Sequence, residues 1–329
     1  MNKTLTMGIL GCGDFLRWNE KAVTGSARVR VKSLFDPDRK RAEKYAAALG
    51  GAAVADEAAV FNDPAIDLVC LFTPPWIRRG QVERAAAAGK HILTTKPLAP
   101  TAADGAAIVK AVTGAKVRCG VLYSRSGDAW MGTVKSLLEG GRFGRLALYR
   151  QDWIHHYPQW NNWALDPKKN GGPFMDAMIH NLNAARYLMG RPVRRATFFS
   201  DRLAHPALTC ADTEAMKLDF ESGAALLFIT WAADLAVWST EGNNREHIEH
   251  FYLVTDAGWM LTKASKDGSP RVRATREGQE EWIDVKAYPA TSFDAFAGAI
   301  ATGGPNPSNL PTADDACEDL RLLETAARA

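Results

Sequence analysis

The sequence predicts an α/β chain in two parts. The first is a doubly wound Rossmann domain, and the second is an α+β domain with a large, mostly antiparallel sheet open on one face. Three observations predict this. Short apolar runs alternate with helical segments over the first 125 residues, glycines follow the first run, and longer alternating strands begin near residue 145. We expect a dinucleotide-binding domain over residues 1–125 and a substrate-binding domain over residues 126–329, whose C-terminal helices can pack back on the first domain.

The N-terminal part reads as alternating strands and helices. Strands are expected at 6–10, 29–35, 65–72, 91–95 and 117–123, and helices at 37–50, 78–89 and 101–114. Continuous apolar strands separated by helices indicate a parallel sheet covered on both faces. Because crossovers between parallel strands are right-handed, the sheet should be doubly wound. A linking helix is expected at 129–141.

The C-terminal part has a different pattern. Strands are expected at 145–157, 193–200, 214–220, 224–234 and 250–256, and alternation of apolar and polar residues is typical of a sheet with one open face. A helix between the first and second of these strands should begin after Gly171-Gly172-Pro173 and end at Gly190. Two further helices are expected at 292–300 and 312–329.

The composition excludes several classes of protein. The chain is 47% hydrophobic and 23% charged with a net charge of +3, and basic residues are dispersed among acids, so we expect no nucleic-acid or membrane partner. We see no signal peptide and no apolar run that could span a membrane. The five cysteines are scattered without a C-x-x-C pair, which favours reduced thiols in the cytoplasm and no metal site.

A glycine turn and an acid indicate a dinucleotide site. The first strand ends in Gly11-Cys12-Gly13, where backbone amides can approach a pyrophosphate, although Leu16 stands where the third small residue of the motif is expected. Asp36 follows about twenty residues later, at the end of the second strand, where an acid binds a ribose diol and repels a 2′-phosphate. NAD is therefore favoured over NADP. Asp36 could also cap the helix that begins at Pro37.

The helix after Gly172 carries two rows of side chains at helical spacing. One row is apolar and should face a core: Met175, Ile179, Leu182 and Ala185. The other row is polar: Asp176, His180 and Asn183. Either the histidine is a structural residue satisfied by a helical neighbour, or the row belongs to an active site.

Two further segments carry a family resemblance. The stretch "CLFTPPWIRRGQVERAAAAGKHILTTKPLAP" follows a strand, and "DPKKNGGPFMDAMIHNL" comes later. Together with "GILGCGDF" and "SLFDPD", in this order, they make the chain resemble the Gfo/Idh/MocA family of NAD(P)-dependent oxidoreductases, which act largely on sugars, inositols and related polyols.

The resemblance implies roles for particular residues. Lys96 matches the lysine that contacts substrate and nicotinamide, in a Lys-Pro bond that is often cis in relatives, and Asp176 and His180 match the family's Asp-x-x-x-His. The cofactor should lie along the Thr73-Pro74 turn and the first loop, which comprises Gly11, Cys12, Gly13, Asp14 and Phe15.

The chain departs from the family pattern at four positions, and these departures bear on the substrate class and on the tuning of Lys96. The family's usual glutamate, histidine, acid and small residue are replaced by Thr95, Arg78, Asn183 and Leu16, respectively.

These residues suggest a mechanism of hydride transfer. We expect His180 to take or return the hydroxyl proton of a carbinol, with Asp176 orienting its imidazole. Lys96 would donate to the same oxygen and stabilise its alkoxide character. The substrate would be a sugar, polyol or cyclitol, and NAD would supply the redox chemistry.

Substrate contacts are expected from polar and aromatic residues: Tyr123, Arg125, His155, Trp163 and Asn183. Aromatic faces beside amides suit a sugar ring, but alternate residues of "WIHHY" must point to opposite faces, so half of them can belong to a core or an interface. Arg125 could hold an anionic or polyhydroxylated substrate or close a surface ion pair.

Two other functions are compatible with these residues. One is a glycoside hydrolase or lyase that retains NAD and uses transient oxidation, and the other is a non-catalytic NAD-sensing protein, for which the replacement at Thr95 leaves room. Relatives commonly associate through the open face of the C-terminal sheet. We expect a homodimer or homotetramer formed in the same way.

Overall fold

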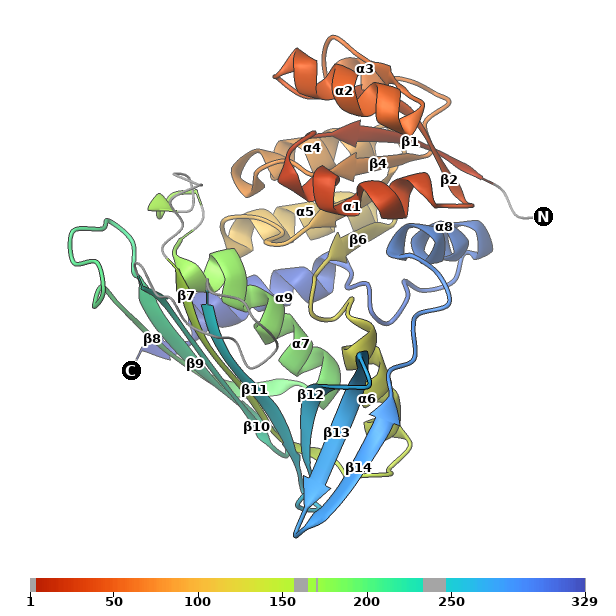
Figure 1. Cartoon of the computed structure of the whole chain (residues 1–329). Coiled ribbons are helices and arrows are strands. Elements are labelled where there is room, and N and C mark those ends of the chain that lie inside the picture. Colours follow the sequence, from red (N-terminus) through yellow and green to blue (C-terminus); the bar gives the residue numbers. More distant parts are fainter. Residues whose placement is uncertain (1–3, 157–164, 170, 233–246, 329) are drawn as a thin grey trace. The chain divides into compact units, whose positions relative to one another are not determined.

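The computed structural model describes residues 4–156, 165–169, 171–232 and 247–328, and the chain divides into two compact units (Figure 1). Unit 1 comprises Met1–Tyr123 and Pro289–Leu320, and unit 2 comprises Ser124–Tyr288 and Arg321–Ala329. Trp163, expected at the substrate site, lies outside the described residues.

Unit 1 contains a parallel sheet of six strands in the order β3-β2-β1-β4-β5-β6. The strands are β1 Leu5–Leu10, β2 Val29–Phe35, β3 Ala52–Ala53, β4 Leu68–Leu71, β5 His91–Thr95 and β6 Cys119–Leu122. The helices are α1 Asp14–Thr24, α2 Arg39–Leu49, α3 Ala58–Phe61, α4 Pro75–Ala87, α5 Ala102–Gly114, α8 Ser292–Thr302 and the first part of α9 Ala313–Thr325. The predicted Rossmann fold is confirmed, and its strand order reverses between β1 and β4.

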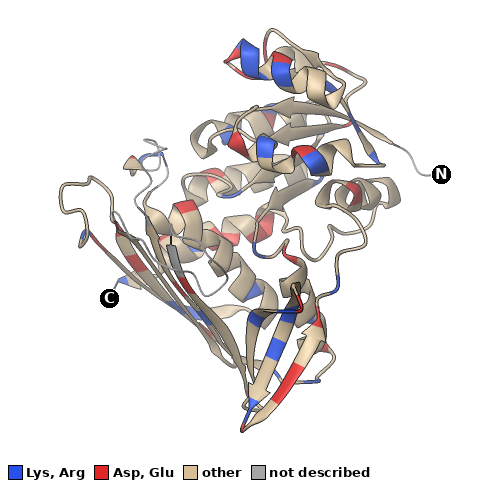
Figure 2. Cartoon of the chain, viewed as in Figure 1, with Lys and Arg blue, Asp and Glu red and all other residues tan. Residues whose placement is uncertain are grey.

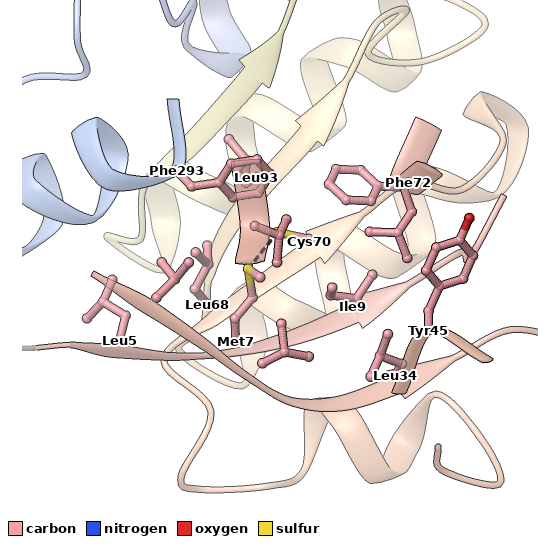
Figure 3. Packing of buried hydrophobic residues seen from close by; sticks show 14 of the residues in the cluster. Leu5, Met7, Ile9, Leu34, Tyr45, Leu68, Cys70, Phe72, Leu93 and Phe293 are labelled. Carbon is pink, nitrogen blue, oxygen red and sulfur yellow. Dashed lines mark hydrogen bonds between the residues drawn. The ribbon is translucent and has the colours of Figure 1, made fainter. Parts of the chain in front are cut away.

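The core of unit 1 explains why its strands are apolar throughout. Met7, Leu68, Cys70 and Leu93 from β1, β4 and β5 are inaccessible to solvent and pack side by side (Figure 3). Phe293 of α8 joins the same cluster, although it lies far later in the chain than β1, β4 and β5. A sheet covered on both faces leaves no solvent-facing side, so its strands show no polar alternation.

Unit 2 contains a nine-stranded sheet in the order β14-β13-β12-β11-β7-β10-β9-β8-β15. The strands are β7 Leu146–His156, β8 Val193–Asp201, β9 Thr213–Phe220, β10 Ala224–Ala232, β11 His247–Thr255, β12 Met260–Lys266, β13 Ser269–Arg276, β14 Gln279–Asp284 and β15 Ala327–Arg328. Two strand pairs, β7 with β10 and β8 with β15, are parallel, and the other pairs in the described sheet are antiparallel. The predicted mostly antiparallel sheet is confirmed.

The described part of unit 2 contains helix α6 Ala129–Glu139, the π-helix η2 Phe174–Met178, helix α7 Ile179–Met189 and the end of α9. Figure 1 shows α6 and α7 on one face of the sheet. Along β10, Ala225, Leu227, Ile229 and Trp231 are buried while the residues between them are partly exposed. The expected alternation is therefore present, and we call the helix-covered side the inner face.

The sequence reading did not anticipate β12, β13 and β14. Charged residues lie along β13 and β14, as Figure 2 shows, so their apolar signal is weak. Their turns have a clear local cause, because Asp267-Gly268 and Glu277-Gly278 both adopt positive φ at two successive residues. Such pairs form the tight hairpin turns that match strand twist.

Candidate functional site

The first loop of unit 1 is built for close approach to its backbone. Gly11 has a φ of +92°, and a Cβ added there would lie 2.6 Å from the carbonyl oxygen of Phe72. Gly13 begins α1 without a side-chain cap, and a Cβ added there would meet no atom within 4 Å. By contrast, Asp38 caps α2 and Thr101 caps α5. The first amides of α1 are therefore suited to a phosphate group.

Asp36 connects this loop to the end of β2. Its carboxylate accepts hydrogen bonds from the backbone N–H of Cys12 at 2.8 Å and of Asp38 at 2.8 Å. The alternative that Asp36 caps the following helix is wrong, because the capping side chain is that of Asp38. Burial, followed by the charge of Asp36, raises the pKa of the Cys12 thiol to about 12. The thiol therefore stays neutral and adds no negative charge beside a pyrophosphate.

The residues at the start of α1 support this loop from below. Leu16 is fully buried in the core of unit 1, so the residue that departs from the glycine motif fills the interior. Phe15 stacks near Phe72 with ring centroids 5.0 Å apart. Asp14 is exposed and pairs with Arg17 at 3.2 Å. The loop is thus fixed by apolar contacts beneath it.

The ends of β4 and β5 form the second half of this edge. Pro74 is the N-cap of α4, and the Thr73 hydroxyl donates to the side chain of Gln81. The Lys96–Pro97 bond is cis, and the backbone N–H of Lys96 donates to the carbonyl of Leu122 at 3.3 Å. Thr73, Pro74 and Lys96 therefore lie at the carboxyl ends of neighbouring strands, where ligands of such sheets bind.

Two departures from the family pattern meet at this edge. Arg78 is fully buried, and its guanidinium donates to the carbonyl of Thr95 at 2.7 Å. It also donates to the carbonyls of Pro97 and Thr73. The replacements at Arg78 and Thr95 are thus joined by a direct hydrogen bond.

Tyr123 directly follows β6, the last strand of unit 1. Only 4% of it is exposed, and its hydroxyl donates to the buried carboxylate of Asp319 in α9 at 2.7 Å. These contacts give Tyr123 a structural role in unit 1. Its expected contact with substrate stays a prediction.

In unit 2, His180 lies half-buried in the first turn of α7. Its Nδ1 accepts a hydrogen bond from the backbone N–H of Ser124 at 3.1 Å. A nitrogen that accepts carries no proton, so neutral His180 in this arrangement carries its proton on Nε2. The ring is therefore held in a defined orientation by the segment that follows β6.

The start of the helix that carries His180 is held by a buried acid. Gly172 has a φ of +102°, and the chain then enters η2 through Pro173. The Glu214 carboxylate accepts from the backbone N–H of Phe174 at 2.7 Å and from the Ser200 hydroxyl at 3.0 Å. Burial raises the pKa of Glu214 to about 7, and the bond from Phe174 opposes this rise.

We expect this acid to make stability depend on pH. Because the folded-state pKa of Glu214 exceeds its ordinary value of 4.5, the folded protein favours the protonated carboxyl group over the carboxylate. The resulting stabilisation is complete below pH 4.5 and is lost as the pH rises through about 7, a difference of about 3 kcal/mol. The free energy of unfolding, measured with urea at pH 5 and pH 8, should therefore differ less between the two pH values in Glu214→Gln than in the wild-type protein.

The neighbouring charges are Asp212, which raises the pKa of Glu214, and Arg328 of β15, which lowers it. Glu221→Gln is a matched control because Glu221 is exposed and pairs with exposed Arg194. An unchanged pH dependence in Glu214→Gln would show that Glu214 does not titrate in this range.

Arg125 belongs to a buried cluster on the inner face of the sheet. It pairs with Glu249 of β11, whose side chain is 3% exposed, so the alternative of a surface ion pair is wrong. The Arg125 guanidinium lies 5.7 Å from the ring centroid of Trp153, and the Trp153 and His155 rings lie 5.2 Å apart. Since Arg125 follows Ser124 directly, the structure links His180, Arg125 and His155 within unit 2.

The asparagines of α7 are both buried. Asn183 is 4% exposed, and Asn181 accepts a hydrogen bond from the Tyr149 hydroxyl at 2.8 Å. Asp176 is half-buried in η2, and the apolar row of the helix faces the interior as predicted, except that Met175 is only half-buried.

Sequence reasoning missed three residues that shape this site. Ser124 acts through its backbone, so no side-chain signal could have identified it. Glu214 and Glu249 are acids on the inward faces of β9 and β11, whose other inward residues are mainly apolar, and that pattern could have identified both. An acid on the buried face of a strand requires a partner.

The described residues contain neither a cluster of metal ligands nor a membrane-spanning helix. Within residues 4–156, 165–169, 171–232 and 247–328, no group of three or more His, Cys, Asp or Glu side chains is arranged to hold a metal ion. In the same described ranges, no helix has both the length and the apolar character needed to cross a membrane.

The chain is similar to known dehydrogenases along its length. It is 25% identical to the inositol 2-dehydrogenase of Streptomyces avermitilis over 320 residues, covering 91% of this chain and 90% of that protein. It is 28% identical to the scyllo-inositol 2-dehydrogenase (NAD(+)) of Bacillus subtilis over 230 residues, covering 68% of this chain and 66% of that protein. The solved aldose-aldose oxidoreductase of Caulobacter crescentus has the same fold, with a TM-score of 0.82 at 22% identity over 98% of this chain and 96% of that one.

Two family models match successive parts of the chain. The oxidoreductase family with an NAD-binding Rossmann fold matches residues 5–123, and the GFO/IDH/MocA C-terminal domain matches residues 131–241. The matches follow the order of the two sheets, and the uncapped α1 and Asp36 fit NAD as the cofactor. The chain belongs to the GFO/IDH/MocA family of NAD-binding oxidoreductases.

Proposed function

We propose that the protein transfers hydride between NAD and a carbinol or carbonyl carbon of a sugar, polyol or cyclitol, with His180 as the acid/base. The observation that carries this proposal is the half-buried imidazole of His180 in the first turn of α7, four residues after half-buried Asp176 in η2. The names of similar proteins, inositol 2-dehydrogenase and aldose-aldose oxidoreductase, support the substrate class.

NAD, when bound, accepts or returns the hydride, and the chain supplies position and charge. The α1 amides and the loop from Gly11 to Phe15 would hold the pyrophosphate, and Asp36 would hold a ribose diol. The Thr73-Pro74 turn would lie along the cofactor.

Proton transfer requires a change in the hydrogen bonding of His180. For Nε2 to accept the carbinol proton, the ring must carry its own proton on Nδ1, and the Ser124 amide can then no longer donate to that atom. We propose that the Nδ1–H group then donates a hydrogen bond to the carboxylate of Asp176, which lies four residues earlier on the same helical segment. Lys96 would donate to the substrate oxygen and stabilise its negative charge during hydride transfer.

The substrate contacts would come from the inner face of unit 2. Arg125, His155 and Asn183 are proposed contacts, together with Tyr123 of unit 1 and Trp163 outside the described residues. The Trp153 and His155 rings offer apolar faces, and the Arg125–Glu249 pair offers charged groups for hydroxyls. This chemistry suits a polyhydroxylated ring.

The test is to incubate the purified protein with NAD or NADP and to follow nicotinamide absorbance across a panel of sugars, inositols and sugar acids. Reduction of NAD by one group of polyols would support the proposal. Tight NAD binding without any absorbance change would contradict it. Cleavage of a glycoside panel would then favour the NAD-retaining hydrolase or lyase, and no reaction would favour an NAD-sensing protein.

We also propose a cytoplasmic homodimer or homotetramer formed through the outer face of the unit 2 sheet. All five cysteines are buried thiols that form no disulfide, which suits a reducing compartment. The outer face has a hollow of about 670 Å³, and Leu226 and Phe228 line it beside Asp152 and Lys217. An apolar hollow with opposite charges suits a second copy of the same surface.

A charged residue in this hollow should separate the subunits. Phe228→Asp would bring an unpaired carboxylate into the contact, so analytical ultracentrifugation should show mainly monomer. Ile77→Asp, at an exposed position of α4 in unit 1, is the matched control. If the wild-type chain sediments as a monomer, the proposed association is refuted.

A further inference from the structure

Arg78 is a buried cation whose guanidinium donates to main-chain carbonyls. It lies in the second turn of α4 and is 1% exposed. One guanidinium nitrogen donates to the carbonyls of Thr95 at 2.7 Å, of Leu98 at 3.4 Å and of Pro97, and the other donates to the carbonyl of Thr73. No acidic side chain of the described ranges forms an ion pair with it.

Stability alone gives no reason for such a residue. Removing a charged group from water is costly unless an opposite charge compensates it, and carbonyl dipoles compensate only in part. Burial lowers the pKa of Arg78 to about 9, and the titratable groups that act on it are those of Cys119 and Tyr123. The guanidinium therefore keeps its charge at neutral pH.

The contacts that Arg78 makes at the end of the sheet point to the cofactor. Thr73 follows β4 and Thr95 ends β5, and these strands are neighbours in register, with Leu71 opposite Thr94. The guanidinium thus joins the carboxyl ends of two parallel strands, and two of its carbonyl partners, Thr95 and Pro97, flank Lys96 in the chain. In a doubly wound sheet that reverses between β1 and β4, the acid at the end of β2 marks the adenosine half, so the nicotinamide half falls at β4 and β5.

We propose that Arg78 is a positioning residue of the nicotinamide half-site, which fixes the Lys96 segment against the Thr73-Pro74 turn and places a fixed positive charge behind them. This inference rests on the proposed NAD function. The oxidised nicotinamide ring carries a positive charge that the reduced ring lacks. A buried cation nearby therefore favours binding of NADH over NAD⁺.

Three variants separate charge from geometry. Arg78→Met removes the charge and all four carbonyl contacts, whereas Arg78→Lys keeps a charge but has a single ammonium that cannot span both strand ends. Arg79→Met is the matched control, because Arg79 is the exposed neighbour and pairs with Glu83 and Asp104. The dissociation constants of NAD⁺ and NADH are measured by calorimetry for each variant, with thermal unfolding without cofactor alongside.

We expect Arg78→Met to shift the ratio of the two dissociation constants toward NAD⁺ by roughly threefold to tenfold. Arg78→Lys should keep the wild-type ratio while weakening the binding of both NAD⁺ and NADH. Arg79→Met should change neither dissociation constant. If the ratio of the two dissociation constants is unchanged in a folded Arg78→Met protein, the proposed effect of the charge on cofactor binding is overturned. If Arg78→Met does not fold, Arg78→Lys decides, because wild-type affinities for both forms in that variant overturn the positioning role.

The readout does not depend on turnover. If no substrate on the panel reacts, the proposed hydride transfer fails while the ratio of NADH to NAD⁺ affinity still decides the role of Arg78. If neither nucleotide binds the wild-type chain, both proposals fail.

Discussion

His180→Ala is expected to lower the turnover number by about 100-fold to 10,000-fold, because general acid–base catalysis by a positioned side chain contributes that much. The affinity for NAD should stay unchanged, since the proposed phosphate and ribose contacts lie in unit 1 and His180 lies in unit 2. Steady-state kinetics on the best substrate from the panel, with NAD binding measured separately, checks both parts.

A matched variant tests whether any histidine change has this effect. His205→Gln alters a histidine whose backbone N–H donates to Asp212 at 2.6 Å and to which we assign no role at the site. Its turnover should equal that of the wild-type protein. Full activity in His180→Ala would show that another group transfers the proton.

Asp36 is expected to control both the affinity for NAD and the rejection of NADP. In Asp36→Ala the affinity for NAD should fall by about 10-fold to 100-fold, because a hydrogen bond to a charged group contributes about 1.5–3 kcal/mol. The same change removes the acceptor for the Cys12 amide and loosens the phosphate loop. Asp36→Ala alone therefore mixes two effects on binding.

Asp36→Asn separates them. It keeps an acceptor oxygen for the Cys12 amide but removes the negative charge that repels a 2′-phosphate, so the preference for NAD over NADP should shrink by about tenfold or more. Asp38→Asn is the control, because asparagine caps α2 as well as aspartate does and the charge removed is two residues away. Unchanged affinities for both cofactors in Asp36→Asn would show that Asp36 does not bind the ribose.

Local sequence patterns were enough to predict the parallel sheet of unit 1, most strands of the sheet in unit 2 and the types of residue at the site. Strand and helix periodicities are local properties, so the alternation along β10 and the continuous apolar strands of unit 1 could be read directly. The glycine turn and Asp36 were readable for the same reason, because a tight turn and an acid after a strand have local signatures. The charged strands β13 and β14 were missed because charged residues on both hide that periodicity.

Only the tertiary structure decided the partners of those residues. Arg125 pairs with Glu249, 124 positions away, and Phe174 donates to Glu214, 40 positions away. The bond between Arg78 and Thr95 likewise depends on β4 and β5 being neighbours in the sheet. Periodicity specifies which face a side chain occupies, but the partner on that face is set by strand order and register, which residues far apart in the chain determine together.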